Sequence, residues 1–276
     1  MDTNSLIYTL LHLRNWGPKK IHSYVSSCSF NFKKCVENLA NILSDEEKIA
    51  FKKELVNSKK VLKINYDLGI KTSNILEAEF PKKLYSSTEK CVFLFYRGNI
   101  DLLSKKSIVI IGTRNPELEF IKNGIKATSY FSNKNYVIVS GLAIGCDSLA
   151  HKTCLDFNGK TIAVLPSPCD NIQPRSNKIL AEKIVQSGGL LISEYSSGAT
   201  ISKYHYPQRD RIQSLLSSVI LIIQASDNSG TMIAVKKNLR DGKIVYALKG
   251  NNLSLVKNYI NVDSEYDLKE IKNHII

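Results

Sequence analysis

Six short apolar segments lie between residues 107 and 247, and helix-length stretches separate most of them. The segments are rich in Val, Ile and Leu without regular polar alternation, which is typical of strands buried on both faces. The predicted strands are residues 108–111, 136–139, 161–165, 190–192, 219–223 and 244–247. Apolar strands that alternate with helices form a parallel sheet. We therefore expect an α/β fold with an extended, Rossmann-like, parallel-rich sheet and helices on both faces.

The first 65 residues contain no such segment and carry helix signals instead. Leu6, Leu10 and Leu13 recur on one side of a predicted helix. Residues 44–47 read Ser-Asp-Glu-Glu, in which a capping serine precedes acidic residues of a first turn. A small all-helical domain is therefore expected before the sheet.

The turn between the first two predicted helices reads Trp-Gly-Pro-Lys-Lys-Ile over residues 16–21. It is either a plain interhelical turn or part of a helix-hairpin-helix module, which offers backbone N–H groups to phosphate. The plain turn is favoured because the usual first glycine of the module is missing. We predict a small helical domain (helix-hairpin-helix or SAM-like) over 1–65, a Rossmann-like domain over 66–255 and a short C-terminal tail over 256–276.

The 276 residues carry a formal net charge of +13 at pH 7. This excess favours a polyanionic partner, nucleic acid or an anionic membrane surface, and a lysine-rich solvated surface is the alternative. The longest apolar run, residues 219–223, is far shorter than the roughly 18 residues that cross a bilayer, so no membrane partner is expected. The N-terminus lacks the basic opening of a signal peptide. Six cysteines without a C-x-x-C pair indicate reduced thiols and a cytoplasmic protein, and no metal is expected.

Three segments that follow predicted strands have the residues of ligand-binding loops. Residues 112–116 read Gly-Thr-Arg-Asn-Pro, residues 140–147 read Ser-Gly-Leu-Ala-Ile-Gly-Cys-Asp, and residues 226–232 read Ser-Asp-Asn-Ser-Gly-Thr-Met. Ligands of open parallel sheets bind beyond the carboxyl ends of the strands, where small residues let backbone N–H groups approach phosphate. Arg114 adds a forked cation that can grip phosphate or stack on a base. One such turn is explained by tight βα geometry, whereas three favour a ligand site.

Catalytic and cofactor signals are weak. None of the three loops is a G-x-G-x-x-G or a Walker loop, so no dinucleotide and no other cofactor is expected. Asp147 and His151 are four residues apart at a predicted helix start. A structural pair is favoured over an acid–base pair, because no nucleophile lies nearby. No catalytic residue is predicted.

Between residues 80 and 250 the motifs resemble, in order, those of the DprA/Smf family of DNA-processing proteins. The matching segments are 97–98 (RG), 112–114 (GTR for GSR), 140–147 (SGLAIGCD for SGLAxGxD), 150–151 (AH), 159–165 (GKTIAVL for GGxTIAVL), 191–195 (LISEY for LLSEY), 206–212 (YPQRDRI for FPxRNRI) and 229–232 (SGTM for SGSL or SGTM). The resemblance implies a homodimer that binds single-stranded DNA, protects incoming strands in natural transformation and loads the RecA recombinase. It implies a binding protein and not an enzyme.

The predicted DNA site combines residues at positions of the family's motifs with neighbouring aromatic and basic residues. Tyr204 and Tyr206 lie beside Lys203, Arg209 and Arg211, and aromatics interleaved with cations suit single strands. The residues predicted to bind DNA are Gly112, Thr113, Arg114, Ser140, Gly141, Ala143, Tyr206, Arg209, Arg211, Ser229, Gly230 and Thr231.

The chain departs from the family pattern in three ways. Residues 167–177 lack the two glycines and the tyrosine of the family's GTGxDxxYPxxN. Asp210 replaces an asparagine between two arginines, which puts a negative charge near the expected DNA face. The chain ends too early for the winged helix of many members, so none is expected. The changes tune affinity or mark a divergent paralogue with another task.

The alternative function is nucleotide binding, as a SLOG-type sensor or a LOG-like phosphoribohydrolase of the same superfamily. The hydrolase signature P-G-G-x-G-T-x-x-E uses its glutamate for the chemistry. Alignment of Gly230-Thr231 on its GT places Ala234 at that glutamate. Hydrolysis thus loses its best candidate group, whereas nucleotide sensing stays open.

Overall fold

The computed structural model describes residues 1–86 and 88–275, which divide into two compact units. The first unit consists of Met1–Tyr96, Pro168–Asp170 and Ser193–Ala199, and the remaining residues form the second. The predicted boundary at residue 65 falls inside the first unit, because the strand that follows residue 70 contacts the N-terminal helices.

The first unit consists mainly of helices, as the sequence predicts. Its helices are α1 (Thr3–Leu11), α2 (Pro18–Ser27), α3 (Phe32–Ile42) and α4 (Asp45–Asp67), with a 3-10 turn η1 (Lys82–Leu84). Strand β1 (Lys71–Asn74) pairs antiparallel with β2 (Phe93–Gly98). The start of α4 is fixed by a capping box between Ser44 and Glu47. The ring of Trp16 is buried against Tyr24, so the turn before α2 serves the core.

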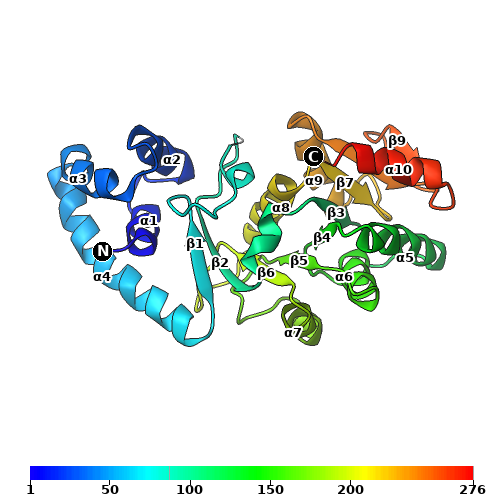
Figure 1. Ribbon diagram of the computed structural model, residues 1–276, viewed down its shortest axis with the longest axis horizontal. Coiled ribbons are helices and arrows are strands. Elements are labelled where there is room, and N and C mark those ends of the chain that lie inside the picture. Colours follow the sequence, from blue (N-terminus) through cyan, green and yellow to red (C-terminus); the bar gives the residue numbers. More distant parts are fainter. Residues whose placement is uncertain (87, 276) are drawn as a thin grey trace. The chain divides into compact units, whose positions relative to one another are not determined.

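The second unit contains the predicted alternation of strands and helices (Figure 1). Its strands are β3 (Ser107–Ile111), β4 (Val137–Ser140), β5 (Thr161–Val164), β6 (Leu190–Ser193), β7 (Val219–Ile222), β8 (Ile244–Leu248) and β9 (Asn258–Ile260). Its helices are η2 (Ile100–Ser104), α5 (Leu118–Asn133), α6 (Cys146–Asp156), η3 (Arg175–Asn177), α7 (Lys178–Gln186), α8 (His205–Leu216), α9 (Gly230–Arg240) and α10 (Glu265–Asn273). All six predicted strands are confirmed.

The strands of the second unit lie in the order β6-β5-β4-β3-β7-β8-β9, and their pairings among the described residues are parallel. The chain starts in the middle at β3, winds outward to β6, then returns beside β3 and winds the other way. The strand order therefore reverses between β3 and β7. In doubly wound sheets, ligands bind beyond the carboxyl ends of the strands at such a reversal.

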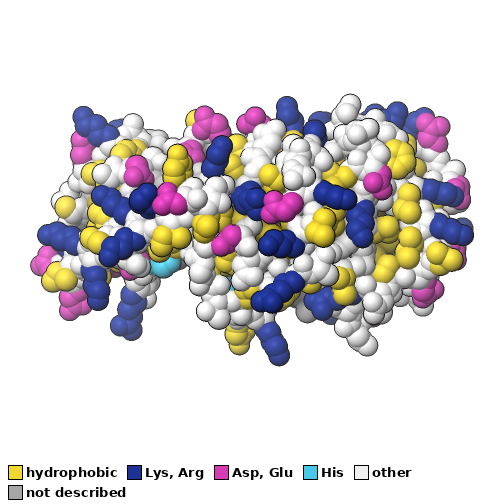
Figure 2. All heavy atoms as spheres, turned by 90° about the horizontal axis from the view of Figure 1, so that it is seen from below, with side chains coloured by type: hydrophobic (Ala, Val, Ile, Leu, Met, Phe, Trp, Pro, Cys, Tyr) yellow, Lys and Arg dark blue, Asp and Glu magenta, His cyan; other side chains and the backbone are white. Residues whose placement is uncertain are grey.

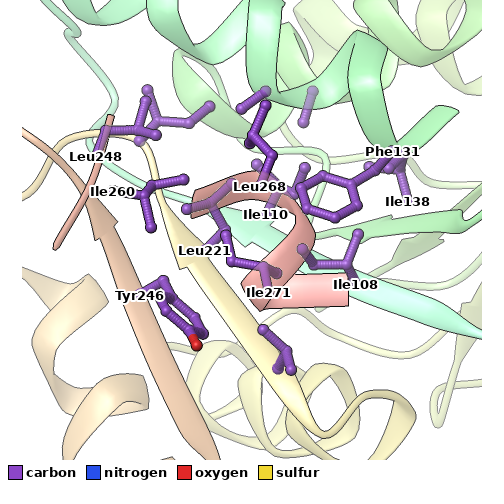
Figure 3. Close-up of a cluster of buried hydrophobic side chains, with 14 of the residues drawn as sticks. Ile108, Ile110, Phe131, Ile138, Leu221, Tyr246, Leu248, Ile260, Leu268 and Ile271 are labelled. Carbon is purple, nitrogen blue, oxygen red and sulfur yellow. The ribbon is translucent and has the colours of Figure 1, made fainter. Parts of the chain in front are cut away.

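Helices cover both faces of this sheet. Ile108 and Ile110 of β3 point into a cluster with Phe131 of α5 and with α10 (Figure 3). Residues of α8 contact β3, β4 and β5, yet α8 contributes nothing to this cluster, so it covers the opposite face. Figure 1 shows α5 and α6 on one side of β3 and β4 and α8 on the other. The expected two-sided α/β architecture is confirmed.

The segment after residue 255 is more than a tail. Strand β9 extends the sheet beside β8. Leu268, Ile271 and Ile275 are buried in the same cluster as Phe131 (Figure 3). The segment predicted as a short tail over 256–276 thus contains β9 and α10, and the apolar residues of α10 recur at helical spacing and complete the core. No helix in the described part of the chain is both long and apolar enough to cross a bilayer.

One buried histidine links α6 to the sheet. The side chain of His151 is fully buried, and its Nδ1 lies 2.7 Å from Thr161 Oγ1, whose hydroxyl donates to Ile138 O. Burial, reinforced by the charge of Arg209, lowers the pKa of His151 to about 3. The predicted pairing of His151 with Asp147 is replaced by this contact with Thr161.

The buried neutral imidazole should make stability depend on pH. An unfolded histidine titrates near pH 6.5, so between about pH 6.5 and 3 the unfolded state binds a proton that the native state excludes. Stability should fall as the pH is lowered through this window, by about 2 kcal/mol between pH 7 and pH 5. Urea unfolding of the wild type and of His151→Asn at both pH values measures the effect. The variant should lose less stability on acidification, and equal losses would contradict the account.

Candidate nucleic-acid interface

A cavity of about 370 Å³ opens at the carboxyl edge of the second unit's sheet. Its walls include Ile111 at the end of β3, residues 112–114 after it, Ala143 in the loop after β4, and residues 229–231 at the start of α9, which follows β7. Strands β3 and β7 are the neighbours at which the strand order reverses. The cavity thus lies where the fold places ligands.

The loop after β3 is held by backbone contacts that need a glycine. A Cβ on Gly112 would come within 2.6 Å of Cys146 Sγ and 2.7 Å of Gln224 O. The N–H of Thr113 donates to Gln224 O at 2.7 Å, and Thr113 O accepts from Cys146 N at 3.0 Å. These contacts tie the loop to the end of β7 and to the start of α6. The side chain of Arg114 therefore starts from a fixed backbone.

Two features of the cavity are suited to an anion. Arg114 is exposed, and among the residues that the structure describes it forms no ion pair. The N-terminal turn of α9 carries no acidic residue, and Gly230 there faces open space. The hydroxyl of Ser229, the N-cap, has no hydrogen-bond partner in the described structure. A helix N-terminus and a free guanidinium both attract phosphate oxygens.

Arg209 of α8 lies in the same cavity wall, but its guanidinium is already occupied. Its Nη1 donates to Gly141 O and, at 3.3 Å, to Val164 O. Its Nε donates to Asp210 Oδ1 at 2.7 Å, and Nη1 lies 4.0 Å from Asp147 Oδ2. The side chain is only 8% exposed. Arg209 therefore ties the ends of β4 and β5 to α8.

Asp147 completes this cluster from the other side. Its Oδ2 accepts from Gly141 N at 3.1 Å and from Ala143 N at 3.4 Å. The amide of Gln213 accepts from Gly141 N at 2.9 Å and donates to Asp210 Oδ1 at 3.1 Å. Burial raises the pKa of Asp147 although the charge of Arg209 opposes the shift. Because these N–H groups are satisfied internally, the loop after β4 is shaped by the protein itself.

The structure brings most of the predicted DNA-binding residues together. Nine of the twelve line the 370 Å³ cavity: Gly112, Thr113, Arg114, Ala143, Tyr206, Arg209, Ser229, Gly230 and Thr231. Gly141 lines a smaller neighbouring cavity of about 120 Å³, together with Arg114 and Tyr206.

Two predicted residues lie outside both linings. Ser140 is fully buried, and its hydroxyl donates to Ile110 O at 2.7 Å, so it ties β4 to β3. Arg211 is 5% exposed, and its Nε donates to Gln208 Oε1 at 3.2 Å. Arg211 points away because it is two residues from Arg209 on a helix, where such residues do not share a face.

The sequence did not reveal Gln213, and the structural role expected for Asp147 involves Gly141, Ala143 and Arg209 as partners in place of His151. A signal existed: Tyr206, Arg209, Asp210 and Gln213 recur at i, i+3, i+4 and i+7, which places them on one face of α8. Ala234, at the position of the hydrolase glutamate, also lines the cavity. No group of three metal-ligating side chains occurs within the described residues.

Surface charge alone does not locate this site. On the face drawn in Figure 2, dark blue Lys and Arg side chains are more frequent than magenta acidic ones, and the two kinds are interspersed. On this face, basic and acidic side chains are mixed and no purely basic patch is seen. The geometry at the carboxyl edge of the sheet defines the candidate site.

Comparison with known proteins agrees with the geometry. The profile of the family described as DNA recombination-mediator protein A matches residues 71–259. The chain belongs to this family. It is 34% identical over 193 residues to DNA processing protein DprA of Bacillus subtilis and 35% identical over 180 residues to that of Streptococcus pneumoniae, covering 70% and 65% of this chain. These alignments span 65% and 63% of the two relatives, slightly less than two thirds of their length.

Solved structures of the family have the same fold. The X-ray structure of DprA from Streptococcus pneumoniae aligns with 99% of this chain and 93% of its own, at a TM-score of 0.75 and 28% identity. DNA processing protein A from Helicobacter pylori, studied for its single-stranded DNA binding mode, aligns with 74% of this chain and 97% of its own, at a TM-score of 0.64 and 25% identity. The family resemblance expected from the motifs is confirmed.

Removal of the Arg209 guanidinium tests its role within the fold. Arg209→Met would leave Asp147 buried without a cation, and breaking such a pair destabilises proteins by about 3–5 kcal/mol. Adding Asp147→Asn should recover part of the loss, since a neutral amide needs no counter-charge. Urea unfolding of both variants gives the values. An Arg209→Met variant with wild-type stability but weaker DNA binding would contradict this role and favour direct contact with DNA.

Proposed function

We propose that this protein binds single-stranded DNA in the cavity between the ends of β3 and β7. The observation that carries the proposal is that one cavity is lined by the start of α9 and by Arg114, which forms no ion pair with any residue the structure describes. Both groups favour phosphate. Tyr206 lies in the same wall and offers a ring to a base. The single-stranded DNA binding of the Helicobacter pylori relative supports the assignment.

The size of the cavity favours a splayed nucleotide over an intact duplex. A volume of about 370 Å³ is in the range that holds a small molecule. Single strands expose their bases, which can turn out of the stack and enter such a cavity, whereas paired bases cannot. Preference for single strands with little sequence dependence follows, because backbone phosphates supply most of the contacts.

We further propose the biological role that the family implies. The protein acts in the cytoplasm as a homodimer, protects incoming strands during natural transformation and hands them to the RecA recombinase. Phage defence and recombination repair use the same binding chemistry and are the competing settings. A monomer in light scattering at micromolar concentration would count against the dimer, and unchanged RecA nucleation on coated strands would count against the transfer.

The proposed activity is binding and not catalysis. The wall position that corresponds to the hydrolase glutamate is Ala234, which carries no acid. The carboxylates of Asp147 and Asp210 are engaged with Arg209 and backbone N–H groups. A reacting nucleotide would therefore meet no free general acid or base from these groups.

Arg114 gives the sharpest test of the proposed site. Arg114→Ala should weaken binding of a labelled oligothymidylate by roughly 1–3 kcal/mol, the range of a charge-assisted contact. Arg114→Lys should recover only part of the affinity, because an ammonium cannot make the forked contact. Fluorescence anisotropy measures both, and circular dichroism should show an unchanged fold because the side chain is exposed.

The matched control is Arg175→Ala, which removes an exposed arginine that lines neither cavity. It should bind like the wild type. If Arg114→Ala also binds like the wild type, DNA does not use this cavity and the proposed site is wrong.

A further inference from the structure

Three aromatic side chains form a partly exposed cluster in the first unit. His22 of α2, Phe30 and Tyr85 contact one another, with ring centroids 5.7–6.1 Å apart. Phe80 stacks beneath Tyr85 at 6.2 Å and is only 2% exposed, whereas Phe30 is 37% exposed. We call His22, Phe30 and Tyr85 the aromatic triad. Phe80 packs against the triad from the buried side, whereas Phe30 of the triad is accessible to solvent.

The backbone holds Phe30 at the surface against its own preference. Ser29 and Phe30 follow the end of α2 with φ values of 55° and 54°, the left-handed region that glycine usually occupies after a helix. A bulky residue there is an outlier. Hydrogen bonds from Phe30 N to Val25 O and from Ser29 N to Ser26 O, both 2.9 Å, keep the turn in place. Such strain is concentrated at functional positions, and here it goes with a Phe30 ring that is exposed to solvent.

Two lysines, Lys19 and Lys90, lie close to members of the triad. Residues 18–34 contain four lysines and no acidic residue. Of these, Lys19 lies one turn before His22 on α2, and both side chains reach the surface. Lys90 Nζ donates to Tyr85 O at 2.6 Å, which holds the ammonium beside the triad. Burial, and secondarily the charge of Lys90, lowers the pKa of His22, which keeps its ring neutral near pH 7.

We propose that the aromatic triad is a second single-stranded nucleic-acid site, where unpaired bases stack on Phe30 and Tyr85 while Lys19 and Lys90 contact phosphates. Every base offers a π-face, so aromatic rings flanked by cations bind single strands without regard to sequence. A partner protein would be expected to meet a broader apolar surface than two or three ring edges. The inference rests on the proposed function, because it extends the same ligand to a site in the other unit.

Photo-crosslinking of the full chain tests the site directly. An oligothymidylate that contains 5-iododeoxyuridine is bound and irradiated, and the crosslinked peptides are identified by mass spectrometry. A stacked base should crosslink to Phe30 or Tyr85. Crosslinks confined to peptides of the second unit would overturn the triad while leaving the carboxyl-edge site intact. Triad crosslinks that persist in Arg114→Ala would support the triad independently of that site.

Substitution separates stacking from structure. The double variant Phe30→Leu/Tyr85→Leu keeps apolar bulk but removes the ring faces, and it should weaken oligothymidylate binding by roughly tenfold. Phe30→Trp/Tyr85→Trp should restore the affinity. The control Tyr66→Leu removes a 74% exposed tyrosine of α4 outside the triad and should change nothing.

Each contrary outcome is decisive. Wild-type affinity of the leucine variant would overturn the proposal. So would a loss that tryptophan does not restore, because the rings would then act in folding. An equal loss for duplex DNA would also overturn the proposal, because the bases of a duplex are paired and cannot stack on the rings.

Discussion

The buried guanidinium of Arg209 organises the candidate site. It joins carbonyls at the ends of two strands to two carboxylates, with only 8% of its side chain exposed. A buried cation must be fully paired, so Gly141, Val164, Asp147 and Asp210 are all required to meet it. Gly141 is a glycine because a Cβ there would collide with this guanidinium. The loop after β4 is therefore held on several sides by these buried contacts.

The residues that line the cavity fall into two groups, those that form its wall and those that can bind a ligand. Arg209 pairs with Asp147 and Asp210, Gln213 pairs with Asp210, and all of these except Asp210 also bond the backbone of Gly141, so they form the cavity wall. Among the residues that the structure describes, Arg114 forms no ion pair and the hydroxyl of Ser229 has no hydrogen-bond partner, so these groups have the capacity to bind a ligand. Asp210, which the sequence places near the expected DNA face, is paired with Arg209. Its negative charge is thereby offset within the protein.

The sheet and the position of the candidate site could be predicted from the sequence, because strands buried on both faces are short apolar runs. The six apolar runs predicted the six central strands, and the parallel sheet then placed the three loops at one edge. The burial of Arg209 and Arg211 could not be predicted, since an arginine in a polar helix is read as exposed until its partners are known. Those partners, such as Gly141, are distant in sequence. The packing of α10 on α5 could not be predicted either, because charged residues dominate the composition of α10 and hide its apolar face.

The central claim is that the cavity binds the phosphates and splayed bases of a single strand. Equilibrium titration with single-stranded and duplex DNA of equal length, over a range of salt concentrations, tests it most directly. The account predicts tighter binding of the single strand, with an affinity that falls with salt at a log–log slope of roughly −0.7 per phosphate contact. Equal affinity for the two forms, or an affinity independent of salt, would contradict it.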